Sequence, residues 1–421
     1  MTGRSRSHPR HRWLLTGAAA LTAALALTVS ATTPALAAAT SVRAGTSRPA
    51  TRPRTLPAPS GNAFYTPPDP LPAGSPGDII WYRSTPSPAS GDQAWQILYL
   101  STAVSGAPTA VSGTVIVPSS PYQGNRPLVA YAPGTQGWAA QCAPSREMAA
   151  GDFDEQFAVN NLLTEGWAVV VTDYPGLGTP GPELYNVGIP EGYAVLDALR
   201  AATRLPGAGL GPDTPMGIEG YSQGGAAADW AAQLQPSYAP ELDLAGVAAG
   251  GTPANLQDVA NNINGGLFFA FLAGTAIGFD AAYPSLHLLS DLSAAGKTAF
   301  AQLQTMCQIP GLAAFAGKSI QDYTVGGVNP MGDPAWTKVL DANNLGSMTP
   351  QVPLYEYHGF LDEVIPYSVE QNLHGAYCTR GVDTTLTGYV GDHVLTQLEA
   401  QSNTVGWLGV RFAGTTATSD C

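Results

Sequence analysis

The chain has 421 residues, and its 18 Lys and Arg stand against 31 Asp and Glu, which gives a formal net charge of −13. Eight of the basic residues lie at or before Arg54, where no acidic residue occurs. The rest of the chain therefore holds 10 of the 18 basic residues and all 31 acidic ones, a net charge of −21. A surface this acidic argues against nucleic acid as a partner and against electrostatic docking on anionic lipid.

The first residues have the pattern of a targeting segment. A start rich in arginine is followed by the apolar run Trp13–Val29 and by the small residues Ala35-Leu36-Ala37. This pattern predicts a secretory signal peptide over residues 1–37. A membrane anchor is the alternative, but the apolar run is short and a cleavage site follows it. Because no two arginines are adjacent there, we expect general secretion to the extracellular space rather than the twin-arginine route.

The remainder divides into a short linker and a large domain. Residues 38–60 are rich in Ala, Thr, Pro, Arg and Ser, with almost no large apolar side chain, and we expect a disordered linker or pro-segment. Residues 61–421 are long enough for one large domain with an insertion. In a secreted chain, its cysteines favour two disulfides over a metal site, since no CxxC pair occurs and histidine is scarce; they are Cys142, Cys307, Cys378 and Cys421.

Apolar strands alternate with helical patterns along this domain. Several of the strands are continuous apolar runs, as expected where helices cover both faces of a sheet. Strands are predicted at Gly113–Val117, Pro127–Tyr131, Ala168–Thr172, Met216–Glu219, Leu244–Ala248, Pro353–Tyr357 and Thr385–Val390. Helices are predicted at Phe153–Glu165, Glu191–Thr203, Gly224–Gln233, Val369–Tyr377 and Leu395–Phe412. The order indicates an α/β fold, a doubly wound and mostly parallel sheet.

One connection is far longer than a crossover helix requires. Between Ala248 and Pro353 the chain is mostly helical in composition and includes the apolar run Gly266–Phe279. We expect residues 255–348 to form a helical cap over the carboxyl edge of the strands, where its apolar inner face would hold the acyl part of a substrate. Additional core packing is the alternative.

The run Gly-Tyr-Ser-Gln-Gly-Gly at 220–225 joins a predicted strand to an alanine-rich helix. A serine in such a tight turn needs small neighbours, which Gly220 and Gly224 provide. The turn lifts the hydroxyl of Ser222 clear of the sheet and points a helix N-terminus at it, which favours developing negative charge. Ser222 is therefore the candidate nucleophile, and a glycine-lined turn with a solvated serine is the alternative.

A nucleophilic serine needs a histidine as base. The candidates beyond the signal peptide are His287, His358, His374 and His393. His287 falls within the helical insertion and His374 within a predicted amphipathic helix, which suits structural or surface roles, and His358 ends a strand. We expect His393 to be the base, because it follows the last strand just before the closing helix.

The base in turn needs a carboxylate that orients its ring. Asp362 follows a strand end and a glycine, and a Val-Ile-Pro segment after it would hold the loop in place. Asp362 is the expected acid, with Glu363 as the neighbouring alternative. Asp392 is a third choice, since it is adjacent to the histidine and badly placed to reach its ring.

An oxyanion hole requires two backbone donors. One is expected from the N–H of Gln223, directly after the serine. The other is expected from Thr135 or Gln136, in the glycine-bracketed turn after the strand Pro127–Tyr131. A plain strand-ending turn is the alternative for that loop.

Together these motifs resemble the secretory lipase family, which includes the fungal lipase A type and actinobacterial members. The resemblance covers about residue 61 to the C-terminus and rests on Ala132–Gly137 with Cys142–Ser145, Asp173–Gly178, Gly220–Gly225, His358–Asp362 and Gly391–His393. It implies an α/β-hydrolase with a helical cap before the acid-bearing strand, cleaving carboxylic esters, typically acylglycerols. It also implies a disulfide between Cys142 and Cys307, which leaves Cys378 for Cys421.

The sequence thus predicts a secreted serine ester hydrolase, most simply a lipase that forms an acyl-enzyme. No metal, organic cofactor or obligate protein partner is implied, and we expect transient contact with a lipid interface through the cap. Two enzymatic alternatives keep the same residues, namely action on other esters with acyl transfer, and peptide cleavage. A binding protein on a hydrolase scaffold is a further alternative, although such proteins usually lose one of the three residues.

Overall fold

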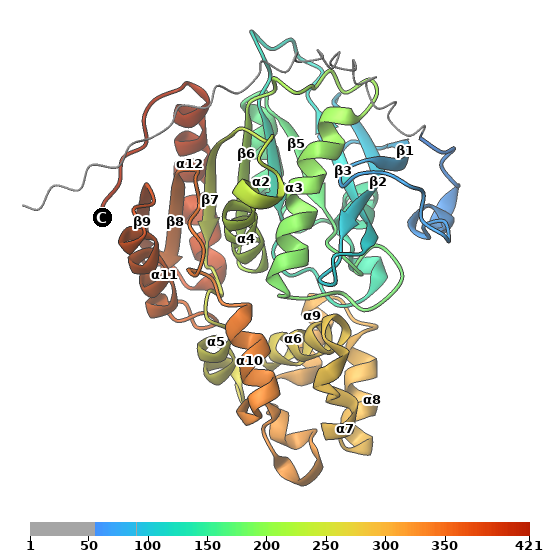
Figure 1. Ribbon diagram of the computed structural model, residues 1–421, viewed down its shortest axis with the longest axis vertical. Coiled ribbons are helices and arrows are strands. Elements are labelled where there is room, and N and C mark those ends of the chain that lie inside the picture. Colours follow the sequence, from blue (N-terminus) through green and yellow to red (C-terminus); the bar gives the residue numbers. More distant parts are fainter. Residues whose placement is uncertain (1–54, 90) are drawn as a thin grey trace, which may run out of the picture. The chain divides into compact units, whose positions relative to one another are not determined.

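The computed structural model describes residues 55–89 and 91–421. Their centre is a nine-stranded sheet in the order β1-β2-β3-β5-β4-β6-β7-β8-β9 (Figure 1). The strands are β1 Ile79–Thr85, β2 Gln93–Thr102, β3 Pro108–Val117, β4 Leu128–Ala132, β5 Ala168–Thr172, β6 Met216–Tyr221, β7 Leu244–Gly250, β8 Leu354–Gly359 and β9 Thr384–Tyr389. From β5 to β9 all neighbours in the sheet are parallel, whereas β1, β2, β3 and β5 pair antiparallel.

The predicted doubly wound α/β fold is confirmed, with two strands added. β1 and β2 were not predicted; they form an antiparallel extension of the sheet with β3, which itself starts earlier than expected, at Pro108. These strands carry no crossover helix, so a search for alternating strand and helix patterns does not detect them.

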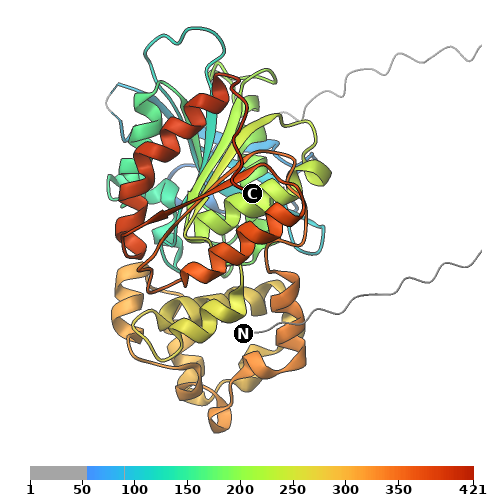
Figure 2. The same ribbon diagram turned by 90° about the vertical axis from the view of Figure 1, so that its left-hand side faces the viewer.

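Helices cover both faces of the sheet. On one face α3 Gly188–Arg204, α4 Gln223–Tyr238 and α11 Tyr367–Thr379 pack into the largest apolar core. On the other face α1 Pro144–Ala150, α2 Gln156–Thr164 and α12 His393–Phe412 enclose a second core. Figure 2 shows the sheet nearly edge on, with the dark red α12 on one side and α4 and α11 on the other. The central strands are thus buried on both faces, which explains their continuous apolar sequences.

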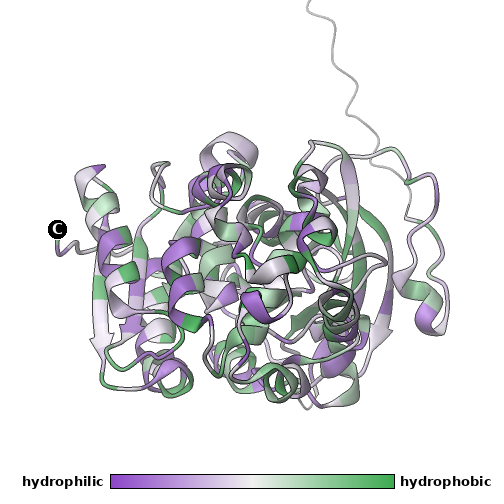
Figure 3. Cartoon of the chain, turned by 90° about the horizontal axis from the view of Figure 1, so that it is seen from below, coloured by the Kyte–Doolittle hydropathy of each residue, from purple (hydrophilic) through white to green (hydrophobic). Residues whose placement is uncertain are grey.

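The long connection between β7 and β8 is helical. It contains α5 Leu256–Ile263, α6 Phe269–Ala282, α7 Leu288–Asp291, α8 Ala294–Leu303, α9 Gln308–Phe315 and α10 Pro334–Ala342. These helices, olive (α5) through gold to orange in Figure 1, lie together beyond the end of the sheet at which β7 leads into α5. Seen from that end, hydrophilic and hydrophobic residues are interleaved along them (Figure 3).

Helix α6 is the apolar centre of this connection. It is apolar on all sides, and most of its residues from Phe269 to Phe279 are buried, as expected of a helix without a polar face. Its glycines allow close packing on the sheet domain: a Cβ on Gly274 would lie 1.8 Å from Trp138 Nε1, and one on Gly278 2.6 Å from the backbone N of Tyr185. The connection is therefore packed tightly onto the residues that follow β4 and β5.

The predicted signal peptide, residues 1–37, lies outside the described residues, and so does most of the predicted linker. Of the linker, residues 55–60 are described, and Leu56 N donates to Ile80 O at 2.8 Å, which ties this segment to β1. Among the helices that the structure describes, none is long and apolar enough to cross a membrane.

Candidate active site

Ser222 lies at the sharp turn between β6 and α4. Its φ of 59° and ψ of −122° place it in the left-handed half of backbone space, a strained conformation for a residue with a side chain. A Cβ on Gly220 would lie 2.1 Å from Gly224 O, and one on Gly224 would lie 1.9 Å from Ala132 O. Only glycine is tolerated at either position, because strand, turn and helix approach so closely there.

The predicted residues Ser222, His393 and Asp362 come from distant parts of the chain and are joined by two hydrogen bonds in succession. Ser222 Oγ is 2.9 Å from His393 Nε2, and His393 Nδ1 is 2.6 Å from Asp362 Oδ2. The other carboxylate oxygen accepts the N–H groups of Val364 and Ile365 at 2.9 and 2.7 Å, which fixes the carboxylate plane. Burial alone would raise the pKa of Asp362, but His393 and His358 beside it hold that pKa well below its usual range. Asp362 is therefore an anion held against the imidazole.

The other two carboxylates considered for the acid have different positions. Glu363 Oε2 accepts the backbone N–H of His393 at 3.2 Å and does not bond its ring. Asp392 caps helix α12, since its Oδ1 accepts the N–H of Leu395 at 2.8 Å. His393 itself is the first residue of α12 rather than part of the loop before it. Of the three acids, only Asp362 bonds the ring of His393 in the structure.

The remaining described histidines lie elsewhere. His374 lies in α11 and bonds Glu356 Oε2 through Nδ1 at 2.6 Å. His358 is fully buried at the end of β8 and bonds Glu370 Oε2 through Nδ1 at 2.9 Å. His287 lies in the connection before α7. None of the three bonds Ser222.

The turn after β4 lies beside the serine. Within the described residues, the N–H groups of Gln223, Thr135 and Gln136 donate to no other group of the protein. The turn is held from both sides, since Thr135 Oγ1 bonds Tyr185 Oη at 2.7 Å and Gln136 O accepts Gln308 N–H at 2.8 Å. The first turn of α4 and the start of this loop lie against each other, and both carry N–H groups without a partner in the protein, which makes these groups candidates for an oxyanion hole.

Glu155 supports the same turn from behind, a residue that the sequence did not indicate. Its carboxylate accepts the Gly134 N–H at 3.0 and 3.1 Å and the Tyr131 hydroxyl at 2.9 Å. Burial, and to a smaller extent the charge of Asp154, raises the pKa of Glu155 to about 7. Glu155 positions the loop that carries the candidate donors.

A cavity opens from Ser222 into the helical connection. Its wall is apolar apart from a few neutral polar side chains, and no charged residue lines it. Helices α5, α6 and α10 supply much of the wall. The lining residues are Tyr185, Asn186, Ser222, Gln223, Pro253, Leu256, Val259, Ala260, Ile263, Phe271, Leu272, Thr275, Ala276, Ile320, Pro330, Met331, Trp336, Leu340, Val364 and Ile365.

Buried carboxyl groups surround the nucleophile turn. The side-chain nitrogen of Gln223 donates to Glu183 at 3.0 Å and to Glu191 at 2.7 Å, and Gln401 donates to Glu219 at 2.8 Å. Burial raises the pKa of Glu183 to about 8 and that of Glu219 to about 8, because the interior disfavours their charged forms.

These shifts predict a stability that falls as the solution becomes alkaline. The folded-state pKa values of Glu183 and Glu219 are about 8 and lie above the usual 4.5. The two groups therefore add to the free energy of unfolding fully below pH 4.5, and this contribution is lost as the pH rises through 8. Asp362, whose pKa is lowered, loses its contribution only at a pH far below this window. We expect the melting temperature to be higher at pH 5.5 than at pH 9, by roughly 5 °C or more. Scanning calorimetry of the wild type and of Glu219→Gln, which should weaken the dependence, checks this; a melting temperature that rises toward pH 9 would contradict it.

One disulfide joins the loop after β4 to the helical connection. Cys142 and Cys307 are bonded, and their Cα atoms are 5.4 Å apart. Trp138 N donates to Met306 O at 2.9 Å beside it. The pairing is the one that the family resemblance implies.

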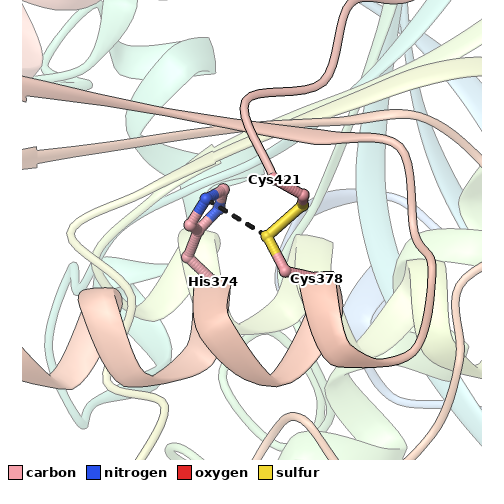
Figure 4. A group of neighbouring side chains, drawn as sticks. All are labelled: His374, Cys378 and Cys421. Carbon is pink, nitrogen blue, oxygen red and sulfur yellow. Dashed lines mark hydrogen bonds between the residues drawn. A yellow bond between two sulfur atoms is a disulfide. The ribbon is translucent and has the colours of Figure 1, made fainter.

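The second disulfide, between Cys378 and Cys421, holds the C-terminus on α11. His374 lies next to it, with Nε2 3.5 Å from Cys378 Sγ (Figure 4). The same nitrogen is 3.1 Å from Asp420 Oδ1. The histidine and the two sulfur atoms lie close enough together to suggest a metal site. Both sulfurs are used in the disulfide, however, so they offer no thiolate ligands.

Comparison with known proteins agrees with this geometry. The family model for secretory lipases matches residues 151–420. The chain is 31% identical to a secreted triacylglycerol lipase of Malassezia globosa, over 84% of this chain and 79% of that protein. It is 30% identical to a Mycobacterium tuberculosis protein named a probable inactive lipase, over 85% of this chain and 83% of that protein. The solved structure of Candida antarctica lipase A in its closed state matches with a TM-score of 0.79 at 25% identity, over 87% of this chain and 89% of that one.

The sheet, the strained serine turn and the structural match define an α/β-hydrolase. The chain belongs to the secretory lipase family, and it is a carboxylic ester hydrolase. The relatives named as secreted and the two disulfides are consistent with an extracellular protein.

Proposed function

We propose that this protein is a secreted lipase that cleaves acylglycerols through Ser222, His393 and Asp362. The observation that carries the proposal is the unbroken line of hydrogen bonds from Ser222 Oγ through His393 to Asp362, at 2.9 and 2.6 Å, at the mouth of an apolar cavity. A nucleophile, a base and an orienting acid in contact are what acyl transfer requires.

The reaction proceeds in two halves. His393 Nε2 takes the proton of Ser222 Oγ as the oxygen attacks the ester carbonyl, and Asp362 stabilises the imidazolium that forms. The N–H of Gln223 and that of Thr135 or Gln136 bind the oxyanion of the tetrahedral intermediate. His393 then gives its proton to the leaving alcohol, and water releases the acyl group from Ser222 by the same steps.

The helical segment 255–348 acts as a cap that binds the acyl chain. Helices α5, α6 and α10 supply apolar walls, so a long chain leaves water when it binds. On the outside, the cap exposes large apolar side chains through which it would contact a lipid surface transiently; they are Leu267, Leu289, Ile309, Val325 and Val328. A signal peptide over residues 1–37 and a linker over 38–60 complete the proposed organisation.

Peptide cleavage is the less favoured alternative. A peptide terminus needs a charged partner, and no charged side chain lines the cavity. An esterase or acyltransferase acting on other esters would use the same residues, so the substrate test has to compare ester classes directly.

The test is a series of p-nitrophenyl esters from acetate to palmitate, beside emulsified triacylglycerol and a peptide anilide. We expect hydrolysis of the esters and the triacylglycerol, and none of the anilide. The variant Ala260→Phe narrows the cavity wall at α5, and we expect kcat/KM for long-chain esters to fall about tenfold while that for the acetate changes little.

The matched control is Ala295→Phe, on an exposed position of α8 outside the cavity, which should leave the whole series unchanged. Activity on the anilide alone would refute the lipase proposal. An equal loss on short and long esters in Ala260→Phe would refute the placement of the acyl chain.

A further inference from the structure

His358 is a second imidazole behind the candidate acid, and the reaction described above does not use it. It is the next-to-last residue of β8, is fully buried, and lies four residues before Asp362 in the chain. Its Nε2 is 3.2 Å from Asp362 Oδ2, the same oxygen that bonds His393 Nδ1 at 2.6 Å. Two imidazoles therefore share one carboxylate oxygen.

The surroundings of His358 determine its charge. Nε2 faces Asp362 Oδ2 and the carbonyl oxygen of Ile365, 2.8 Å away, and Nδ1 faces Glu370 Oε2 at 2.9 Å. Glu370 Oε2 also accepts the N–H of Thr252 at 2.9 Å. Every polar atom that faces the ring is thus an acceptor, and a ring that donates from both nitrogens is an imidazolium.

Two further titratable groups lie near His358. Tyr367 on α11 meets the ring edge on, with centroids 5.8 Å apart, and Asp229 on α4 bonds the Thr252 hydroxyl one step further away. Burial alone would lower the pKa of His358, but its hydrogen bonds to Asp362 and Glu370 raise that pKa to about 10. Among the groups that shift the pKa of Asp362, the two that carry positive charge are His393 and His358.

We propose that His358 is a protonated positioning residue of the Ser222 reaction, which holds Asp362 in place and limits how strongly that carboxylate stabilises a proton on His393. When His393 takes the serine proton, Asp362 lies between two cations instead of beside one. The positive charge of His358 opposes the positive charge that His393 gains in this step, because like charges repel across the shared carboxylate oxygen. The inference rests on the proposed triad and predicts activity that persists into mildly acidic solution.

The variant His358→Gln tests the charge. Glutamine keeps an N–H donor for Asp362 but is neutral. We expect the acid limb of the pH profile of kcat/KM on p-nitrophenyl butyrate to move to higher pH by roughly half a pH unit or more. Activity would then fall several-fold at pH 5 and less at pH 8. An acid limb at the wild-type position would overturn the proposal, whatever the loss of stability.

His374→Gln is the matched control. It removes a histidine that also bonds a buried carboxylate, Glu356, but that lies away from Asp362. We expect it to lower the melting temperature and to leave the acid limb unchanged. If both variants shift the limb equally, the effect is structural and the proposal fails.

A spectroscopic measurement keeps the proposal testable if His358→Gln does not fold. In wild-type enzyme labelled with 15N-histidine, we expect one buried imidazole to carry protons on both nitrogens from pH 6 to pH 8.5, and its signals to persist in His374→Gln. If every buried histidine ring has one unprotonated nitrogen at pH 7, the proposal is overturned. If the wild type shows this imidazolium but hydrolyses no ester, the proposed function is refuted, whereas the positive charge of His358 is supported.

Discussion

Replacing Ser222 with alanine is expected to lower kcat/KM on p-nitrophenyl butyrate by about 10⁴-fold or more. The strained turn places this hydroxyl in the wall of the cavity, and its oxygen is 2.9 Å from His393 Nε2. Without it, no acyl-enzyme forms, and only the oxyanion donors and binding remain. A fluorophosphonate probe should label the wild type stoichiometrically and Ser222→Ala not at all.

The control for this variant is Ser237→Ala, near the other end of α4. It should label and hydrolyse like the wild type. Since one relative is named a probable inactive lipase, the wild-type labelling is itself informative. Folded wild-type protein that neither labels nor hydrolyses would favour the binding-protein alternative, and equal labelling of Ser222→Ala would place the nucleophile elsewhere.

Asp362→Asn is expected to reduce kcat by about 10⁴-fold, with a smaller effect on KM. An amide cannot hold His393 in the tautomer that leaves Nε2 free to accept the serine proton, and it does not stabilise the imidazolium. Asp362 also makes the shortest contact of the line, 2.6 Å to His393 Nδ1. Steady-state kinetics with a soluble ester measures the loss.

Glu363 and Asp392, the two other acids that the sequence offered, serve as controls for Asp362. Glu363→Gln removes the charge from a group that bonds only the backbone of His393, and Asp392→Asn alters a helix cap. We expect each to cost less than about tenfold in kcat, since neither touches the imidazole ring. A loss in Glu363→Gln equal to that in Asp362→Asn would contradict the assignment of the acid.

The elements that could be predicted from the sequence are each marked by a pattern within a short stretch of the chain. The buried parallel strands are continuous apolar runs, and Ser222 lies between glycines that the close approach of β6 and α4 makes obligatory. Glu155 and His358 have no such signature, because their partners lie on other segments: Glu155 bonds Gly134, 21 residues earlier, and His358 bonds Glu370, 12 residues later. Burial and long-range contact, which give these two residues their roles, are properties of the folded chain.

The proposed cap, residues 255–348, is attached to the sheet domain at both α9 and α5. At α9 it is fixed by the Cys142–Cys307 bond and by the backbone hydrogen bond from Gln308 to Gln136, beside the candidate oxyanion donors. At α5, toward the loop that carries Asp362, the side chain of Asn262 donates to two backbone carbonyls, both at 3.0 Å. Any movement of the proposed cap that admits a substrate is therefore expected to leave α9 joined to the candidate oxyanion loop, so that this loop keeps its shape.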